Sequence, residues 1–300
     1  MVKLAITGAT GYLGSAFIKR YSTRFDIFCI VRKDSDIKIL SESRCRIIKY
    51  GEWEELYEKM KVVSPDILVH LAGVFLNEHN ENTIINMLEC NIMFSTVIVD
   101  AAVCAGCKRI INTSSYWQHY NKERYNPVNL YAATKQSFED ILLYYVKAKE
   151  SSVITLTIFD TYGPFDKRRK VLNLVMETED GKEFGMSDGS QKMYFCYLDD
   201  LIDAYGAAIK RCMAHSPGTY EKYALRDEKP VTLRYAVETL LEVLGKKVKI
   251  NWGKVPNRKR EISDPENIGT VLPEWKPSHT LKEGAEAIKK MYSKIEKEFL

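Results

Sequence analysis

The chain has 300 residues, of which 45% are hydrophobic, and it carries a formal net charge of +4. This length and composition fit one or two globular domains with a substantial buried core. The positive charge is small and spread along the chain, which argues against a nucleic-acid partner and favours a small-molecule partner.

The N-terminal residues and the cysteines indicate the cellular compartment. Met1-Val-Lys-Leu leads into a predicted strand without a signal-peptide pattern, and no apolar stretch reaches the roughly 20 residues needed to span a bilayer. The seven cysteines stand mostly in apolar segments and are interpreted as reduced core residues. Cys104 and Cys107 are not accompanied by a second cysteine pair or a histidine cluster, so no metal site is expected. A cytoplasmic protein without a membrane partner is predicted.

Short apolar strands alternate with helical periodicity through the first 160 residues. Strands are expected at 2–7, 26–31, 46–49, 67–71, 109–112 and 152–159, and helices at 12–21, 53–62, 84–105 and 130–148. Strands that alternate with helices form a parallel sheet covered on both faces. The predicted fold class is therefore α/β, with a doubly wound parallel Rossmann sheet in residues 1–160.

Residues 161–300 follow a looser pattern that begins with a charged loop after Tyr162-Gly-Pro164. Helices are expected at 171–177, 198–213, 232–244 and 281–298, and a strand at 248–251. This part is predicted to be a smaller C-terminal α/β lobe that binds substrate, and we expect the chain to cross back to the first domain.

A glycine-rich turn joins the first strand to the first helix. In Gly8-Ala-Thr-Gly11-Tyr-Leu-Gly14 the glycines allow a tight turn and a close approach of the backbone to a pyrophosphate at the helix N-terminus. The turn therefore predicts dinucleotide binding, with a purely structural turn as the alternative.

A tyrosine and a lysine stand four residues apart in Tyr131-Ala-Ala-Thr-Lys135. On a helix they share one face, so the ammonium can lie close to the phenol and favour its phenolate. This would bring a group with a pKa of about 10 into the range of acid-base catalysis. The spacing alone is common in surface pairs, and the glycine turn gives it meaning.

The second strand ends in Arg32-Lys33. In this fold an acidic residue there binds the ribose 2'-hydroxyl of NAD, whereas arginine accommodates the 2'-phosphate of NADP. Two cations therefore favour NADPH/NADP+ over NAD. A solvated basic turn is the alternative.

The chain resembles the extended short-chain dehydrogenases/reductases, the nucleotide-sugar epimerase, dehydratase and reductase family. The matching motifs occur in family order over most of the chain: Thr7-Gly-Ala-Thr-Gly-Tyr-Leu-Gly14, His70-Leu-Ala-Gly73, Asn112-Thr-Ser-Ser115, Tyr131-Ala-Ala-Thr-Lys135, Tyr162-Gly-Pro164 and Leu198-Asp-Asp200. His70 is interpreted as a packed, hydrogen-bonded residue.

The resemblance implies roles for individual residues. Tyr131 would exchange a proton with the substrate oxygen, Lys135 would hold the nicotinamide ribose and lower the tyrosine pKa, and Ser115 would hydrogen-bond the reacting carbonyl. With Tyr131 and Lys135, the implied cofactor-binding residues are Gly8, Thr10, Gly11, Tyr12, Leu13, Gly14, Arg32, Lys33, Leu71, Ala72, Gly73, Asn91, Thr113 and Phe159. For Asn91 a structural role is the alternative.

The implied substrate is a nucleotide-diphosphate sugar. Met193 replaces a usual family arginine, and Lys192 would compensate for it in part at the diphosphate. Arg258 matches a late family arginine that contacts the diphosphate. A surface charge is the alternative for each. Asp160 stands where relatives have asparagine, and it would bind sugar hydroxyls or a lysine such as Lys170. Ser115 and Trp117 are further substrate candidates, and packing of the loop would explain Trp117 equally well.

The residues around Ser115 narrow the reaction. Dehydratases of the family carry an Asp-Glu pair after the catalytic threonine, whereas Tyr116-Trp-Gln-His119 follows Ser115 here. Within the family the chain resembles 4-ketoreductases of the CDP-abequose and CDP-paratose synthase type. This similarity predicts an NADPH-dependent reductase of a nucleotide-linked 4-keto-(deoxy)sugar in deoxysugar and surface-polysaccharide biosynthesis. The alternatives are an NAD-dependent nucleotide-sugar 4-epimerase and a non-catalytic NADP(H)-sensing protein.

The family pairs subunits through two long helices, which correspond here to 84–105 and 130–148. A homodimer is therefore predicted. Ile98, Phe138, Ile141 and Tyr145 are candidates for its seam, although burial within one subunit would explain them equally well.

Overall fold

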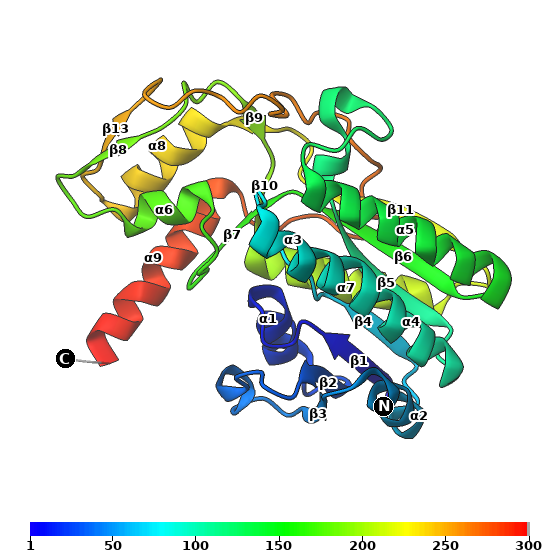
Figure 1. Ribbon diagram of the computed structural model, residues 1–300. Coiled ribbons are helices and arrows are strands. Elements are labelled where there is room, and N and C mark those ends of the chain that lie inside the picture. Colours follow the sequence, from blue (N-terminus) through cyan, green and yellow to red (C-terminus); the bar gives the residue numbers. More distant parts are fainter. Residues whose placement is uncertain (299–300) are drawn as a thin grey trace.

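The computed structural model describes residues 1–298, with side chains through Lys294 (Figure 1). Its centre is a seven-stranded parallel sheet in the order β11-β6-β5-β4-β1-β2-β3. The strands are β1 Lys3–Thr7, β2 Asp26–Arg32, β3 Arg46–Tyr50, β4 Ile67–His70, β5 Arg109–Ser115, β6 Ser152–Ile158 and β11 Tyr220–Leu225.

Helices cover both faces of this sheet, which confirms the predicted doubly wound α/β fold. On one face, α2 Trp53–Val63, α4 Ser95–Cys104 and α5 Leu130–Lys149 contribute to an apolar core with Ala5, Leu68 and Ile110 of the sheet. On the other face, α1 Tyr12–Tyr21 and α7 Leu198–Met213 build a second core. The strand order reverses between β1 and β4, and ligands of such sheets bind beside the carboxyl ends of the strands at this point.

A smaller lobe lies beyond the carboxyl ends of the strands (Figure 1). Its helices are α6 Val171–Glu177, α8 Leu233–Leu244 and α9 Leu281–Glu298. Three two-stranded sheets accompany them: β7 Asp160–Tyr162 with β10 Phe195–Tyr197, β8 Glu183–Gly185 with β13 Lys249–Asn251, and β9 Lys192–Met193 with β12 Val231–Thr232. The seventh strand of the large sheet, β11, comes from beyond residue 160, as does α7.

Two elements differ from the expected ones because their polar residues are paired. β5 continues three residues past Asn112 to Ser115, and the hydroxyl of Thr113 within this extension donates to the His70 carbonyl at 3.0 Å. β11 was not expected, because its sequence includes Glu221 and Lys222, which form ion pairs in the structure. Paired polar side chains can be buried at low cost, so the hydropathy pattern understates these strands.

The helix before β5 begins earlier than expected, and it is more apolar than was predicted from the sequence. A capping box between Asn80 and Thr83 starts α3 Glu81–Leu88, and a π-helical segment, η2 Glu89–Phe94, joins α3 to α4. By length and composition alone the whole helix, Glu81–Cys104, could cross a membrane, since an 18-residue window of it has a mean hydropathy of 1.6; a core helix passes the same test. The expectation that no apolar stretch reaches this length is therefore wrong. One face contributes to the core, while Ile85 and Met93 are exposed.

The residues named for a subunit seam lie largely inside the subunit. Ile98, Phe138 and Tyr145 are buried in the core on the α4/α5 face of the sheet, and Ile141 packs against that core. Of the two explanations left open for these residues, burial within one subunit is the one that the structure shows.

Candidate active site

The glycine turn lies over the end of β4. Gly8 has a φ of 67°, and a Cβ atom on it would lie 2.7 Å from the Leu71 carbonyl carbon and the Ala72 nitrogen. A Cβ atom on Gly14 would lie 2.1 Å from the Gly8 oxygen. Glycine is therefore required at both positions for the backbones to approach so closely. Within residues 1–298, no side chain caps the N-terminus of α1 at Gly11, which leaves N–H groups for an anionic ligand.

The segment after β4 connects the glycine turn to α5. The Ala72 nitrogen donates to Thr7 Oγ1 at 3.3 Å, and a Cβ atom on Gly73 would lie 3.2 Å from Lys135 Nζ. Asn91 holds the following residue, because its Oδ1 accepts from the Val74 nitrogen at 2.8 Å and its Nδ2 donates to the Val74 oxygen at 3.0 Å. The structure thus favours the structural reading of Asn91, while Leu71, Ala72 and Gly73 line the path from the turn to the lysine.

Arg32 and Lys33 stand at the carboxyl end of β2, and both are exposed. The Arg32 side chain is 69% exposed, and its Nε atom lies 3.8 Å from Asp34 Oδ1. A loose pair at such exposure contributes little free energy and leaves the guanidinium able to bind a phosphate.

Four other predicted cofactor residues are partly or fully enclosed. Thr10 and Leu13 are half-buried in and after the turn. The Thr113 hydroxyl lies 2.7 Å from the Tyr205 hydroxyl. The Phe159 ring is stacked on Tyr116 with centroids 4.7 Å apart. Hydrogen bonds hold the Thr113 side chain and ring stacking holds Phe159, so neither side chain offers the cofactor a free polar group.

Tyr12, at the start of α1, lies against the second lobe. Its hydroxyl is buried and has no hydrogen-bond partner among the described residues. The guanidinium carbon of Arg168 lies 4.6 Å from its ring centroid. Arg168 is itself held by Asp166, whose Oδ1 accepts from Nε at 2.7 Å. A cation from the second lobe thus lies beside the glycine turn.

Ser115, Tyr131 and Lys135 come together at the ends of β5 and α5. Tyr131 and Lys135 lie one helical turn apart, and both are buried. Ser115 is the last residue of β5, and its side chain is hydrogen-bonded to Tyr131. The Ser115 hydroxyl oxygen also accepts from the Trp117 nitrogen at 3.3 Å. The structure therefore assembles the three residues that the motifs suggested.

Burial controls the protonation of this group. It raises the pKa of Tyr131 to about 12, while the charge of Arg168 and the hydrogen bond with Ser115 act in the opposite direction. Burial lowers the pKa of Lys135 to about 8, while Cys90 and Glu139 favour its charged form. The expected lowering of the tyrosine pKa by Lys135 is not seen, because Arg168 and Ser115 are the groups that lower it. Tyr131 is a neutral phenol at pH 7, which suits a proton donor.

A cavity of about 490 Å³ is lined by Phe75, Tyr116 and Trp117 and by residues of the second lobe, whereas Ser115, Tyr131 and Lys135 are not among its lining residues. Phe75 links the cavity to these three residues, because its ring centroid lies 5.1 Å from that of Tyr131 and 5.3 Å from that of Trp117. Apolar side chains line one part of the cavity, and its cationic residues are Arg169, Lys170, Arg258 and Arg260. Such a cavity suits a ligand with a flat apolar group and an anionic group.

Asp160 and Lys170 form a half-buried pair in the cavity wall. Lys170 Nζ lies 3.9 Å from Asp160 Oδ1, and Asp160 Oδ2 accepts from the Tyr116 hydroxyl at 2.7 Å. The pairing expected between Asp160 and a lysine is thus confirmed. Burial lowers the pKa of Lys170 to about 8, although Asp160 favours its charged form.

Lys192 is placed differently from the other substrate candidates. Trp117, Asp160, Lys170 and Arg258 line the cavity, but Lys192 is not among its lining residues. Its Nζ atom lies 3.7 Å from Asp264 Oδ2 and 3.9 Å from Glu266 Oε2. Two carboxylates already neutralise this cation, so the structure does not support its assignment to the diphosphate.

The sequence interpretation missed Arg169, Arg260 and Phe75. Arg169 and Arg260 stand in basic runs of the sequence, which could have indicated an anion site. The spacing of these runs does not show which side chains point toward the cavity. Arg258 and Arg260 stack on Trp117 and Tyr120, with guanidinium-to-ring distances of 5.6 and 4.4 Å. These contacts hold both cations beside the cavity.

Two histidines lie near the site, and neither is shown to point into the cavity: His70 is buried in β4, and His119 bonds within its own loop. His70 is buried, its nitrogens lie 2.9 Å from Thr7 Oγ1 and from Ser95 Oγ, and burial lowers its pKa to about 3. The prediction of a packed, hydrogen-bonded residue is confirmed. His119 Nδ1 lies 3.1 Å from the Glu123 carbonyl oxygen.

Comparisons with known proteins find matches over most of the chain. The model of the NAD dependent epimerase/dehydratase family matches residues 4–221. The CDP-abequose synthase of Yersinia pseudotuberculosis is 25% identical over 265 residues, which cover 85% of this chain and 89% of the relative. The CDP-abequose synthase of Salmonella muenchen is 23% identical and covers 97% of both chains.

Solved structures share the fold at low sequence identity. The UDP-glucose 4-epimerase of Thermus thermophilus, in complex with NAD, has a TM-score of 0.82 at 16% identity and covers 97% of this chain and 99% of its own. The UDP-glucose 4-epimerase of Thermotoga maritima, with UDP-glucose, has a TM-score of 0.78 at 18% identity and covers 98% and 99%. The Rossmann-type architecture is therefore confirmed.

Proposed function

The chain belongs to the NAD dependent epimerase/dehydratase family, and on this basis we propose that it is an NADPH-dependent reductase of a nucleotide-linked 4-keto-(deoxy)sugar. The observation that carries the proposal is the cavity beside Tyr131, which combines apolar walls with Arg169, Lys170, Arg258 and Arg260. The cations suit a diphosphate, the apolar part suits a base, and the sugar would reach Tyr131 past Phe75.

The glycine turn and the residues after β4 fit a dinucleotide. Gly8, Gly11 and Gly14 would admit the pyrophosphate to the N-terminus of α1, and Leu71, Ala72 and Gly73 would line its path toward Lys135. Arg32 would contact the 2'-phosphate, which separates NADPH from NAD. Bound NADPH supplies a hydride to a carbonyl carbon.

The residues of the triad would then handle the oxygen of that carbonyl. Ser115 would donate a hydrogen bond to it as negative charge develops. Tyr131, a neutral phenol, would transfer its proton to the same oxygen and complete an alcohol. Lys135 would hold the nicotinamide ribose and stabilise the phenolate that remains.

The wider biological role is part of the same proposal. The relatives named CDP-abequose synthase support a product used as a deoxysugar donor for surface polysaccharide. We propose a cytoplasmic homodimer with an NADP(H)-binding domain in residues 1–160 and a nucleotide-sugar-binding lobe in 161–300. In this division α7 and β11 complete the first domain from the second half of the chain.

The competing function is an NAD-dependent nucleotide-sugar 4-epimerase. Its support is the fold shared with epimerases, one of which is described in complex with NAD. The two functions differ in their use of cofactor, because an epimerase returns the hydride to the same sugar. Purified protein should oxidise NADPH in the presence of a CDP-linked 4-keto sugar. Protein that retains NAD tightly and ignores added NADPH would instead establish the epimerase.

A further inference from the structure

A buried carboxylate lies on the helix that carries Tyr131 and Lys135, and it belongs to a network that includes Ser114 and Gln118, which precede and follow Ser115 in the sequence. Glu139 is on α5, one helical turn beyond Lys135, and is 3% exposed. Its carboxylate accepts hydrogen bonds from the Ser114 hydroxyl, from Gln118 Nε2 at 2.8 Å and from Lys222 Nζ at 2.7 Å. Three such donors compensate the buried carboxylate and fix its position.

The donors come from three different elements. Ser114 is the penultimate residue of β5, Gln118 ends the 3-10 helix η3 Tyr116–Gln118, and Lys222 is on β11. Lys222 Nζ also donates to Gln118 Oε1 at 3.0 Å. The carboxylate therefore connects the strand end, the short helix and the edge strand to α5.

Ser115 lies between two of these attachments. Ser114 precedes it in β5. The Ser115 hydroxyl itself caps η3 by accepting from the Trp117 nitrogen. Tyr131 and Glu139 lie on the same helix, two turns apart. A single buried carboxylate thus ties the segment that carries Ser115 to the helix that carries Tyr131.

Side chains of β11 alternate between the two faces of the sheet, and two of them point toward α5. The side chains of Tyr220 and Lys222 both reach Glu139, with the Tyr220 hydroxyl 3.4 Å from Oε2. Glu221 lies between them in sequence and pairs instead with Arg211 of α7, at 2.6 Å. Successive side chains of a strand point to opposite faces, so β11 places one ion pair on each side of the sheet.

We propose that Glu139 is a positioning residue that holds the Ser115 hydroxyl in register with Tyr131. This inference rests on the proposed function for the identity of the reacting group. Loss of the carboxylate would release Ser114 and Gln118 together, and the Ser115 hydroxyl would shift relative to Tyr131. Misplacement of a catalytic group by about 1 Å can lower the rate roughly 100-fold.

Two variants test the link from different ends. Glu139→Gln removes the charge from the centre of the network, and Ser114→Ala removes one attachment while the Glu139–Lys222 pair remains. Both should lower kcat, by about 10- to 100-fold for Glu139→Gln, while KM for the nucleotide sugar stays within about threefold. If Glu139→Gln does not fold, Ser114→Ala decides the question.

The matched control is the ion pair on the other face of β11. The side chains of Arg211 and Lys222 are both 26% exposed. Lys222→Met should lower kcat as Glu139→Gln does, whereas Arg211→Met should lower Tm as much as Lys222→Met and leave kcat unchanged. Equal effects of Arg211→Met and Glu139→Gln on kcat would reduce Glu139 to a general stabilising residue and overturn the proposal.

A readout that does not depend on turnover separates this inference from the proposed function. Amide hydrogen exchange of residues 114–118 should become at least several-fold faster in Glu139→Gln and Ser114→Ala, and should be unaffected in Arg211→Met. Unchanged exchange in both variants overturns the positioning role. Faster exchange in a protein whose wild type does not reduce nucleotide-linked keto sugars would support the positioning role and reject the proposed function alone.

Discussion

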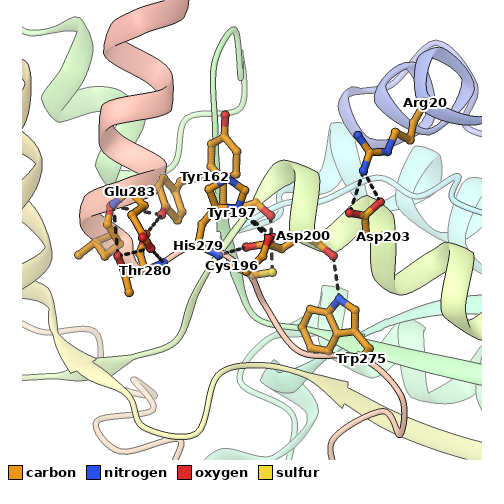
Figure 2. A network of polar contacts seen from close by, with 12 residues as sticks. Arg20, Tyr162, Cys196, Tyr197, Asp200, Asp203, Trp275, His279, Thr280 and Glu283 are labelled. Carbon is orange, nitrogen blue, oxygen red and sulfur yellow. Dashed lines mark hydrogen bonds and ion pairs between the residues drawn. The ribbon is translucent and has the colours of Figure 1, made fainter.

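His279 Nδ1 lies 2.9 Å from Asp200 Oδ1, and this contact ties the second lobe to the first turn of α7 (Figure 2). Asp200 is buried, and it also accepts from the Ser278 hydroxyl and from the His279 backbone nitrogen at 3.0 Å. Its backbone oxygen accepts from Trp275 Nε1 at 2.9 Å. The segment that leads into α9 is thus anchored to a helix that packs on the large sheet.

Asp200→Ala should therefore destabilise the protein strongly. The change removes a buried carboxylate that accepts hydrogen bonds from Ser278 and His279, and we expect a loss of roughly 3 kcal/mol in the free energy of unfolding. Urea denaturation followed by circular dichroism would measure it. Asp203→Ala is the matched control, because Asp203 is on the same helix and forms an exposed pair with Arg20 at 3.0 Å (Figure 2). The control should cost about 1 kcal/mol or less, and equal losses would contradict the anchoring role.

Removal of the Tyr131 hydroxyl should abolish most of the activity. Tyr131→Phe keeps the ring packed against Phe75 and removes the proton donor, so kcat should fall roughly 100- to 10,000-fold. Ser115→Ala should lower kcat roughly 100- to 1,000-fold, because it removes a hydrogen bond to the developing charge. Single-turnover NADPH oxidation under saturating substrate is the measurement. Full turnover by Tyr131→Phe would mean that another group supplies the proton.

Local patterns predicted those parts of the fold whose signals lie within one element. The bounds of α1, α6 and α7 agree with the prediction because their apolar residues repeat with helical spacing. The edge strand β11 was not predicted, because it includes charged residues whose partners, Arg211 and Glu139, lie in other elements. A strand of this kind cannot be recognised without its tertiary contacts.

The same limit applied to the site. Ser115, Tyr131 and Lys135 could be predicted because each is part of a short motif. The cavity could not, since residues from Phe75 to Ile262 build its walls. The position of a single cation in the sequence does not show where its side chain points. Lys192 lies beside Asp264, whereas Arg260 lines the cavity.

We predict a homodimer formed by α5 and the helix Glu81–Cys104. Exposed apolar side chains on these helices are Ile85, Met93, Leu143 and Tyr144, and a second copy would cover them. Met93→Glu should shift the protein from dimer to monomer in sedimentation velocity at micromolar concentration. Val62→Glu, on the more exposed end of α2, is the control and should leave the mass unchanged. A monomeric wild type would contradict the prediction.

Binding of a nucleoside diphosphate should weaken as the pH rises above 8. In the protein without ligand burial holds the pKa of Lys170 at about 8, so its charge is present at pH 7 and is lost above pH 8. A bound phosphate favours the ammonium, which raises its pKa in the complex. Between the two pKa values, binding takes up a proton and Kd should increase by up to about tenfold per pH unit.

Titration calorimetry with CDP from pH 7 to 10 would measure this effect. Lys170→Met should bind CDP more weakly at pH 7, and its Kd should change much less between pH 8 and 10. The Asp160 carboxylate stays in place in this variant, so Asp160→Asn is needed as a second variant to separate its repulsion from the loss of the cation. The same pH dependence in wild type and Lys170→Met would exclude Lys170 as the titrating group.

Arg32 should decide between the two cofactors. Its guanidinium is exposed at the end of β2, where a charge-assisted bond to a 2'-phosphate is worth about 1.5–3 kcal/mol. Arg32→Ala should therefore raise Kd for NADPH about 10- to 100-fold and leave Kd for NADH nearly unchanged. Arg46→Ala is the control, because Arg46 is equally exposed on β3 but lies against Phe28 and Asp26. A wild type that prefers NADH, or an equal loss for both cofactors in Arg32→Ala, would remove the reason to choose a reductase over an epimerase.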